Sequence, residues 1–341
     1  MTTLLTLTPA GLYCPVGAFH IDPCRAVPRA VVTHAHSDHA RPGCERYLIL
    51  EDGIPVFRTR LGNRCDVVAL PAGKTIQRNG VTISLHHAGH ILGSAQVRLE
   101  YRGEIVVITG DYKIQSDLTC AAFEQLRCHT LVTESTFGSP LYRWEEPHVV
   151  IDQVNRWWQF NVDHGCISVI FGYSLGKSQR ILVALERTIG NIYVHKAIAQ
   201  MNEAYRACGV IFPPMTTLEL DTIIPTNSIV VLPPGSRNAI EQLSTIAPVR
   251  TATVSGWMQL KSFRQRTPTD AAFVLSDHAD WAGLNSVITA SQAENILVTH
   301  GASALLARWW QEKGKNAQVL THESFAASTA SEDDPTFAGG A

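Results

Sequence analysis

Short runs of apolar, largely β-branched residues recur along the chain, and several end abruptly in polar residues. The clearest are RAVVTHAH, EIVVITGD, HTLVTEST, CISVIFGYS, SIVVLPPGS, AAFVLSDH and NILVTHG. Continuous apolar runs of this length predict strands buried on both faces of a sheet. Helical patterns lie between many of them: SLGKSQRILVALERTI has Ile181, Leu182 and Leu185 at helical spacing, and AIAQMNEAYRACG ends in a glycine stop. This alternation predicts an α/β fold built in layers.

Length and composition indicate a folded protein with room for two domains. The chain has 341 residues, of which 45% are hydrophobic. The N-terminal residues lack a basic region before an apolar core, and no uninterrupted apolar run reaches the roughly 18 residues that span a bilayer. We therefore expect a soluble, cytoplasmic protein with no membrane segment. Eight cysteines without a C-x-x-C pair favour reduced thiols. The composition of residues 326–341 predicts a disordered tail.

The net charge of −2 gives no long-range attraction for a polyanion, so a nucleic-acid site needs local positive charge. Two windows without Asp or Glu supply it, residues 54–64 and residues 250–269. Solvated surface charge is the commoner origin of such clusters, so each window alone is weak support for nucleic-acid binding.

The segment VVTHAHSDHA places four metal-binding side chains within six residues: His34, His36, Asp38 and His39. In an extended chain His34 and His36 point to the same side, whereas Asp38 and His39 follow in a turn and can reach a neighbouring position. This geometry fits two adjacent metal sites better than one. A single closed structural site is the alternative, but metals held by histidine and carboxylate more often serve hydrolysis, with open positions for water.

Two metals need more ligands than this segment offers, and three further candidates stand at strand ends. His90 lies in the Gly-flanked segment HHAGHILGSAQ, Asp111 follows the strand in VITGDY, and His300 follows the strand in LVTHG. Each residue alone has an ordinary structural explanation. Together with the first cluster, they predict a binuclear metal centre.

The order H-x-H-x-D-H, then a Gly-flanked histidine, then a strand-end aspartate resembles the ligand series of the metallo-β-lactamase superfamily. The resemblance implies two ligand sets bridged by Asp111: His34, His36 and His90 for one metal, and Asp38, His39 and His300 for the other. Zinc is the usual occupant of such sites, and Mn²⁺ also suits these ligands. The resemblance further implies that Asp22 orients metal-binding groups without being a primary ligand.

Three further features resemble the β-CASP branch of this superfamily, whose members cut nucleic acids. TESTFG places Glu134 at a strand end, LSDHADW places His278 at another, and a long interval before His300 leaves room for an inserted domain. The segments GLYCPVGAFHIDPCRAVPRAVVTHAHSDHARPG, AGHILGSAQV, GDYK, TESTFG, YRW, SGWM and SDHADW are similar to the bacterial ligase-associated DNA exonuclease family. The implied fold is a metallo-β-lactamase αββα sandwich, residues 1–148 plus 269–325, with an inserted α/β β-CASP domain at 149–268.

The helix start in YSLGKSQR and the basic window at 250–269 predict contacts with phosphates, because free N–H groups at a helix start favour a phosphate. The predicted phosphate or nucleic-acid contacts are Ser174, Gly176, Lys177, Ser178, Arg180, Ser255, Lys261, Arg264 and Arg266. Trp257 is expected either to stack on a base or to pack in the core.

The resemblance implies a metal-dependent DNA exonuclease that hydrolyses phosphodiester bonds with a hydroxide activated by two metals. The implied catalytic residues are Asp38, Asp111, Glu134 and His278. His278 would hold a phosphate oxygen or protonate the leaving alkoxide, while Glu134 orients its imidazole and raises its pKa. The expected substrate is DNA, in repair or end processing, with an ATP-dependent DNA ligase and a helicase as partners.

Three alternatives to a DNA exonuclease are open. A β-CASP ribonuclease is favoured by His300, because a histidine at this final motif accompanies RNA substrates in the wider branch. A small-molecule ester or thioester hydrolase could use the same metals, but the inserted segment, Glu134 and His278 argue against it. A non-catalytic scaffold that keeps its metal for stability is disfavoured because every expected ligand is present.

Overall fold

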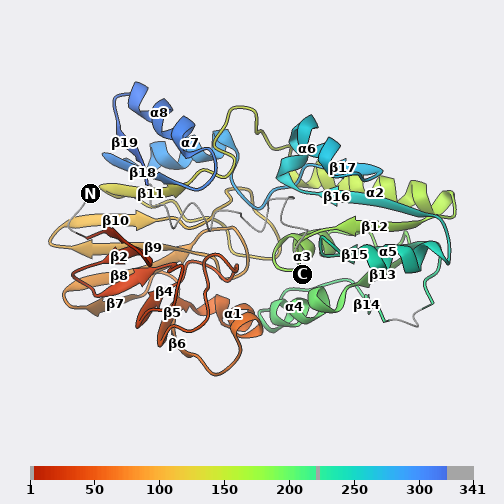
Figure 1. Cartoon of the computed structure of the whole chain (residues 1–341), viewed down its shortest axis with the longest axis horizontal. Helices are drawn as coiled ribbons and strands as arrows, with labels where there is room; N and C mark the ends of the chain where they lie inside the picture. Colours follow the sequence, from red (N-terminus) through yellow and green to blue (C-terminus); the bar gives the residue numbers. More distant parts are fainter. Residues whose placement is uncertain (1–3, 220–222, 321–341) are drawn as a thin grey trace. The chain divides into compact units, whose positions relative to one another are not determined.

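The computed structural model describes residues 4–219 and 223–320, which divide into two compact units (Figure 1). Unit 1 contains the described residues up to Arg143 and from His278 onwards, and unit 2 contains those between Trp144 and Asp277. The predicted domain boundaries after residues 148 and 268 lie five and nine residues from this division and stay a prediction. The predicted disordered tail, 326–341, lies outside the described residues.

Within the described residues, unit 1 contains two sheets. The first has the strand order β1 (Thr6–Thr8), β2 (Gly11–Cys14), β3 (Phe19–Ile21), β4 (Arg29–Val31), β5 (Arg46–Leu50) and β6 (Asp66–Leu70). Strands β1 to β3 pair antiparallel, and β3 to β6 pair parallel. The second sheet has the order β19 (Asn316–Val319), β18 (Asn295–Thr299), β11 (Thr130–Glu134), β10 (Glu104–Ile108), β9 (Ala95–Tyr101), β8 (Val81–His87) and β7 (Thr75–Arg78). Strands β10, β11, β18 and β19 run parallel.

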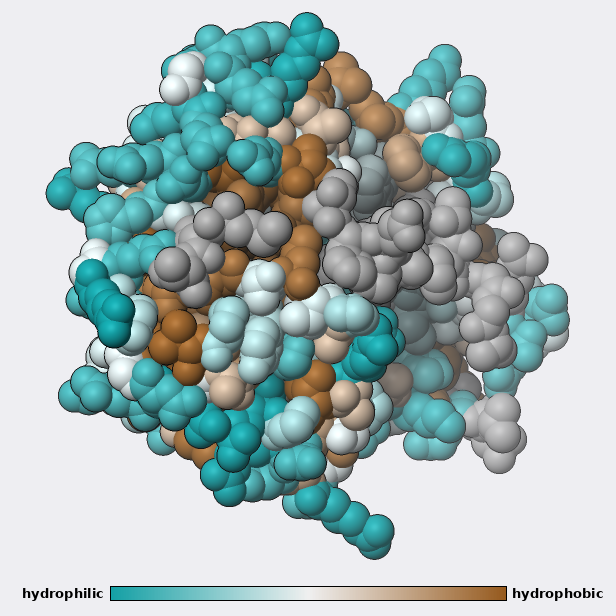
Figure 2. All heavy atoms as spheres, turned by 60° about the vertical axis from the view of Figure 1, so that its left-hand side comes forward, coloured by the Kyte–Doolittle hydropathy of each residue, from teal (hydrophilic) through white to brown (hydrophobic). Residues whose placement is uncertain are grey.

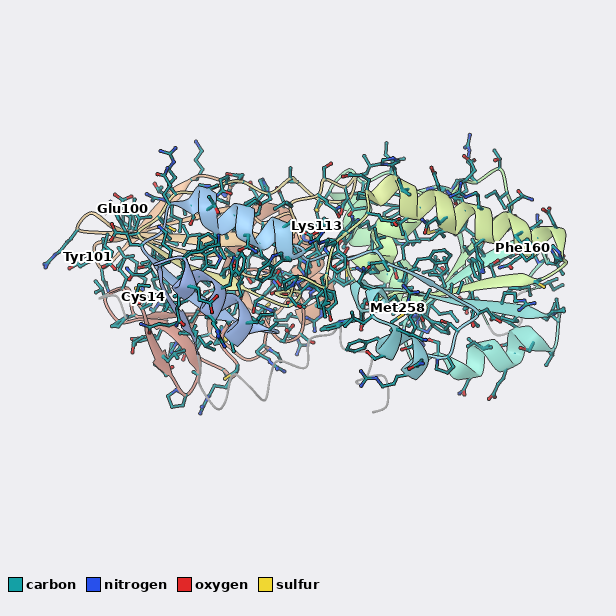
Figure 3. The ribbon with its side chains drawn as sticks, turned by 90° about the horizontal axis from the view of Figure 1, so that it is seen from above. Cys14, Glu100, Tyr101, Lys113, Phe160 and Met258 are labelled. Carbon is teal, nitrogen blue, oxygen red and sulfur yellow. The ribbon has the colours of Figure 1, made fainter. Side chains whose placement is uncertain are left out.

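The two sheets of unit 1 share one apolar core. Ile21 and Val31 of the first sheet belong to the same buried cluster as Ile83, Val97 and Ile108 of the second. Burying apolar area of this kind stabilises a fold by about 25 cal/mol per Å². The hairpin that joins β9 to β10 ends near Glu100 and Tyr101, which Figure 3 labels. At the opposite end of β10, Asp111 follows the strand, just as His34 follows β4 and His300 follows β18.

Helices cover the outer faces of this pair of sheets. α7 (Trp281–Ser291) and α8 (Ser303–Glu312), drawn in blue in Figure 1, bury Leu284 and Leu306 in a second cluster with Leu131 of β11. On the first sheet, the rings of Tyr47 in β5 and Phe57 in α1 (Ile54–Leu61) lie 5.1 Å apart, edge to face. Unit 1 thus has the layer order helix, sheet, sheet, helix. A short 3-10 helix, η1 (Glu51–Gly53), leads into α1.

Unit 2 is a parallel sheet with helices on both faces. Its strand order is β14 (Thr216–Thr217), β13 (Asn191–Val194), β15 (Ser228–Leu232), β12 (Ile167–Phe171), β16 (Val249–Val254) and β17 (Ala271–Phe273). The helices are α2 (Pro147–Asp163), α3 (Lys177–Leu182), α4 (Lys196–Ala207), α5 (Arg237–Ser244), η2 (Gly256–Gln259) and α6 (Lys261–Arg266). Trp158 of α2 and Ile198 of α4 pack on one face, and Leu243 of α5 packs on the other.

Each of the seven apolar runs contains a strand, namely β4, β10, β11, β12, β15, β17 and β18. β11 and β15 are buried along their whole length because layers cover both of their faces. The helix predicted from SLGKSQRILVALERTI is wrong in length, since α3 ends at Leu182. The side chain of Asn155 bonds the backbone of Ala184 and Glu186, so these groups are satisfied without a further helical turn.

Three more features follow from the structure. No helix among the described residues is both long and apolar enough to cross a membrane. The eight cysteines are free thiols. The face of the molecule shown in Figure 2 is largely hydrophilic, with hydrophobic residues visible in smaller groups.

Candidate metal centre

The histidine-rich segment forms a tight, buried turn directly after β4. The backbone N–H groups of His39 and Ala40 both donate to the carbonyl of His36, which closes the turn. His34, His36 and His39 are buried, whereas Asp38 is partly exposed. The first sheet therefore delivers all four predicted ligands to one end of β4.

One group of ligand atoms gathers around His36. The Nδ1 atom of His36 lies 3.1 Å from the Nε2 atoms of both His34 and His90. The Oδ2 atom of Asp111 lies 3.5 Å from His34 Nε2 and 3.9 Å from His90 Nε2. Ligand atoms of all four residues lie within 4.8 Å of one another. Imidazole nitrogens and a carboxylate at these separations can surround a single metal ion.

A second group shares Asp111 with the first. Ligand atoms of His39, Asp111 and His300 lie within 4.8 Å of one another, and the rings of His39 and His300 are stacked 5.5 Å apart. The Oδ2 atoms of Asp38 and Asp111 each lie 3.4 Å from His39 Nε2. A cavity lined by Asp38, His39 and His300 opens at this group. Asp111 is thus common to two adjacent sets of donors.

The environment of His39 fits a bound cation. Its Nδ1 lies 2.7 Å from the Oδ2 atom of Asp22, and because a carboxylate only accepts, Nδ1 carries the proton. The buried Nε2 atom then has no hydrogen-bond partner among the described residues and faces the carboxylates of Asp38 and Asp111. A metal ion bound by Nε2 and these carboxylates would give the nitrogen a partner, and a histidine whose other nitrogen is held by a carboxylate is a common metal ligand.

The electrostatics keep most of these donors in the form that binds metals. The pKa of His34 lies well below its usual value because the ring is buried and lies beside His39. Burial opposes ionisation of Asp111, yet His39 holds the pKa of Asp111 well below its usual value. For His39 itself, burial is outweighed by Asp38, Asp111 and Asp22, which together raise its pKa well above the usual value. A metal ion would therefore displace the proton of His39 when it binds.

Glu134 and His278 form a buried pair beside the first group. The Nδ1 atom of His278 lies 3.0 and 2.9 Å from the two carboxylate oxygens of Glu134. Backbone N–H groups of Tyr112 and Thr136 donate to the same carboxylate, at 2.7 and 3.3 Å. The ring of His278 lies 4.6 Å from that of His90, centroid to centroid. The carboxylate therefore fixes the direction in which the imidazole points.

Asp22 and Thr33 connect the first sheet to the ligands. Asp22, at φ 44°, accepts hydrogen bonds from the backbone N–H of Thr33 at 2.7 Å and from its hydroxyl at 2.5 Å. Asp22 thus holds the start of the ligand segment as well as His39. The structure places it beside the ligands without giving it a ligand position in either group.

The predicted phosphate contacts near α3 do not fit the structure, because the cationic side chains there are buried and already paired. Lys177, Ser178 and Arg180 are buried. The Nζ atom of Lys177 lies 2.9 Å from Asp277 Oδ2 and from the carbonyl oxygen of Leu275, and Arg180 Nη1 lies 3.2 Å from Asp277 Oδ1. Both cations are therefore occupied by an internal carboxylate. The N–H of Gly176 is also taken up, because it donates to the side chain of Gln179 at 2.7 Å.

The other predicted nucleic-acid contacts divide into two kinds. The carbonyl of Ser174 accepts from Gln179, and the hydroxyl of Ser255 accepts from the N–H of Trp257, so both serve local structure. In contrast, Lys261, Arg264 and Arg266 of α6 are exposed. Only these three keep a surface position in which a phosphate contact is sterically open.

Sequence reasoning missed several residues that hold the ligands. The hydroxyl of Ser94 accepts from the N–H groups of His90 and Ile91, at 3.0 and 3.2 Å. Lys113, labelled in Figure 3, is 1% exposed and donates to the carbonyl of His90 at 3.3 Å. The sequence signals for Lys113 are its place two positions after a predicted ligand and in the segment GDYK, and neither indicates that it contacts the His90 loop.

Comparison with known proteins finds relatives named for work on nucleic acids. No family model matches the sequence. The chain is 32% identical over 317 residues to "Probable DNA ligase" of Opitutus terrae, covering 92% of this chain and 31% of that protein. It is 31% identical over 115 residues to "Endoribonuclease YSH1" of Saccharomyces cerevisiae, covering 33% of this chain and 14% of that protein. It is 24% identical over 218 residues to "Transcription termination factor FttA" of Methanosarcina mazei, covering 52% of this chain and 33% of that protein.

The chain spans no more than about a third of the length of these relatives. Among solved structures, it resembles a protein of unknown function from Enterococcus faecalis, with a TM-score of 0.59 and 12% identity. That similarity covers 87% of this chain and 79% of the other, and at this identity it shows a shared fold alone.

Proposed function

We propose that this chain, whose relatives support a place in the β-CASP branch of the metallo-β-lactamase superfamily, is a metal-dependent nuclease. We further propose that unit 1 is the αββα sandwich of that superfamily and unit 2 the inserted β-CASP domain. The layer order of unit 1 and the interruption of its chain by unit 2 support this assignment.

The observation that carries the proposal is a pair of ligand groups that share Asp111 and lie beside a carboxylate-bound histidine. His34, His36 and His90 would hold one divalent ion, and Asp38, His39 and His300 the other, with Asp111 common to both. Two such ions, zinc or manganese, lower the pKa of water and neutralise charge on phosphoryl oxygens when bound at a site of this kind. This chemistry suits the hydrolysis of a phosphodiester.

His278 completes the site as a proton donor. Its Nδ1–H is committed to Glu134, so Nε2 is the nitrogen that would protonate the leaving oxygen. A positioned acid of this type contributes about 100- to 10,000-fold to a rate. Glu134, held in turn by two backbone N–H groups, keeps the ring in one orientation.

The proposed substrate is DNA, and the proposed activity is that of an exonuclease. The match that covers 92% of the chain is to a protein named as a probable DNA ligase, which supports DNA as the substrate and a ligase as a partner. A helicase is also proposed as a partner. RNA is a second candidate of equal standing, because shorter matches are to proteins named as endoribonucleases. The exposed cations of α6 are proposed to contact phosphates, in which case affinity falls as salt rises.

Digestion of end-labelled oligonucleotides tests the proposal. DNA and RNA strands labelled at the 5′ or 3′ end are incubated with the protein and Zn²⁺ or Mn²⁺, with and without a chelator. We expect stepwise shortening that a chelator abolishes and that Asp111→Asn reduces at least about 1,000-fold, because Asp111 belongs to both ligand groups.

A matched control variant is Asp66→Asn, which removes an exposed carboxylate of unit 1 that pairs with Arg46. It should digest like the wild type. Cleavage of p-nitrophenyl esters or thioesters without cleavage of any oligonucleotide would contradict the nuclease proposal. Cleavage of RNA alone would overturn the choice of DNA.

A further inference from the structure

The loop that carries His90 is held by a short segment of chain that follows Asp111. Three successive carbonyls of the loop accept a hydrogen bond from this segment. The backbone N–H of Lys113 donates to Ala88 at 3.2 Å, the thiol of Cys120 donates to Gly89 at 3.3 Å, and the Lys113 ammonium donates to His90 at 3.3 Å.

The ammonium group is itself held in place. Lys113 is 1% exposed and forms an ion pair with Asp117, whose other oxygen accepts from the N–H and the hydroxyl of Thr119, each at 2.6 Å. A buried ammonium needs a charged partner of this kind, because desolvation without compensation is costly. Charge and hydrogen bonds therefore fix Lys113 in one position.

Close packing leaves the His90 loop little freedom to shift. Gly89 has φ 72°, and a Cβ atom there would lie 2.4 Å from the carbonyl oxygen of Lys113. From the other side, the Ser94 hydroxyl accepts from the N–H of His90. Contacts therefore hold the backbone before and after His90 in place. The imidazole, which would bind the metal, is positioned by this backbone.

The geometry points to Lys113 as a positioning residue for the metal ligand His90, acting through a clamp formed by Lys113, Asp117 and Cys120. Lys113 contacts the backbone carbonyl of His90 but no metal-binding atom of either group, so its effect would pass through the backbone of the His90 loop. This inference rests on the proposed metal centre, but the clamp itself is a property of the metal-free chain. Loss of partners that orient a ligand typically weakens metal binding 10- to 100-fold.

Two measurements on the full chain test the clamp, with Lys113→Met as the principal variant. Hydrogen–deuterium exchange of the metal-free protein should become faster in the peptide spanning residues 86–94 and in the clamp segment 113–120 that faces it, and stay unchanged in the rest of the chain. Competition with a chromophoric chelator should show Zn²⁺ binding about 10- to 100-fold weaker for one of two ions.

Lys177→Met is the matched control, because Lys177 is also 1% exposed and its ammonium also contacts one carboxylate and one backbone carbonyl, in unit 2. It should lose stability to a similar degree while keeping the exchange of residues 86–94 and the zinc affinity of the wild type. Asp117→Asn, which keeps the lysine and the size of the side chain, should shift both measurements in the same direction as Lys113→Met. It preserves the test if Lys113→Met does not fold.

Several results would overturn the inference. These are unchanged exchange at residues 86–94, exchange that rises over the whole chain, or equal loss of zinc affinity in Lys113→Met and Lys177→Met. If the wild type binds no metal, the proposed function fails, while the exchange measurement still decides whether the clamp exists.

Discussion

Asp111, Tyr112 and Lys113 are consecutive, and each serves a different part of the candidate site. Asp111 contributes its carboxylate to both ligand groups. The backbone N–H of Tyr112 donates to Glu134 at 2.7 Å, and Lys113 holds the His90 loop. Because β10 ends only a few residues earlier, one rigid strand end determines where all three act.

The role of His278 as a proton donor predicts a specific kinetic defect. His278→Ala should slow cleavage of an ordinary oligonucleotide about 100- to 10,000-fold, because the leaving oxygen loses its acid. A substrate with a nitrophenolate leaving group needs no acid, so its hydrolysis should change by less than about threefold. Rates on the two substrates and the metal content of the variant check this.

Glu134→Gln is the companion variant, since it keeps the shape beside His278 Nδ1 and removes the charge. It should show the same selective defect to a smaller degree. Loss of a metal ion in His278→Ala, with equal slowing on both substrates, would make His278 a ligand instead of a proton donor.

For individual residues, the sequence predicts the metal ligands better than it predicts the residues that hold those ligands in place. His34, His36, Asp38 and His39 stand out because metal donors crowd into one short segment. Lys113 could not be recognised, because its function depends on a backbone carbonyl in another loop. The prediction for Lys177 is wrong for a related reason. The sequence indicates a helix start with free N–H groups, but it does not reveal that the distant Asp277 forms an ion pair with Lys177.

At the scale of elements, strand ends and the turns after them create the site. β4 and β10 end three residues before His34 and Asp111, β18 ends directly before His300, and β11 ends in Glu134. Buried parallel strands have a strong sequence signal, since their residues are apolar on both faces. The end of α3 has no such sequence signal, because the side chain of Asn155, from α2, forms the hydrogen bonds with the backbone of Ala184 and Glu186.

The turn after β18 requires a glycine at position 301. Its φ is 56°, and an added Cβ would lie 2.4 Å from the backbone oxygen of Ser135. Gly301→Ala should therefore lower the free energy of unfolding by about 3 kcal/mol or more, from backbone strain and overlap combined. It should also weaken metal binding, because the neighbouring residue is His300.

Gly314→Ala provides the control, since that glycine has φ 79° but open space around its Cβ position. It should cost only about 1 kcal/mol and leave metal binding unchanged. Urea unfolding of both variants checks the difference. Equal destabilisation by the two substitutions would show that close packing at Gly301 has no role.

At the scale of the whole molecule, every residue of both ligand groups comes from unit 1, although its chain is interrupted by unit 2. His34, His36 and His39 precede the interruption and His300 follows it. Unit 2 supplies the exposed cations of α6 but none of the ligands. This division predicts that metal binding and nucleic-acid affinity can be altered separately.

The most direct test of the account is a titration of the metal-free chain with Zn²⁺ or Mn²⁺, followed by metal analysis and by cleavage of a labelled oligonucleotide. We predict two ions per chain in the wild type, with cleavage rising as the second ion binds, and loss of both properties in Asp111→Asn. Binding of a single ion with full cleavage, or cleavage that persists in a chelator, would contradict a nuclease built on two metals that share Asp111.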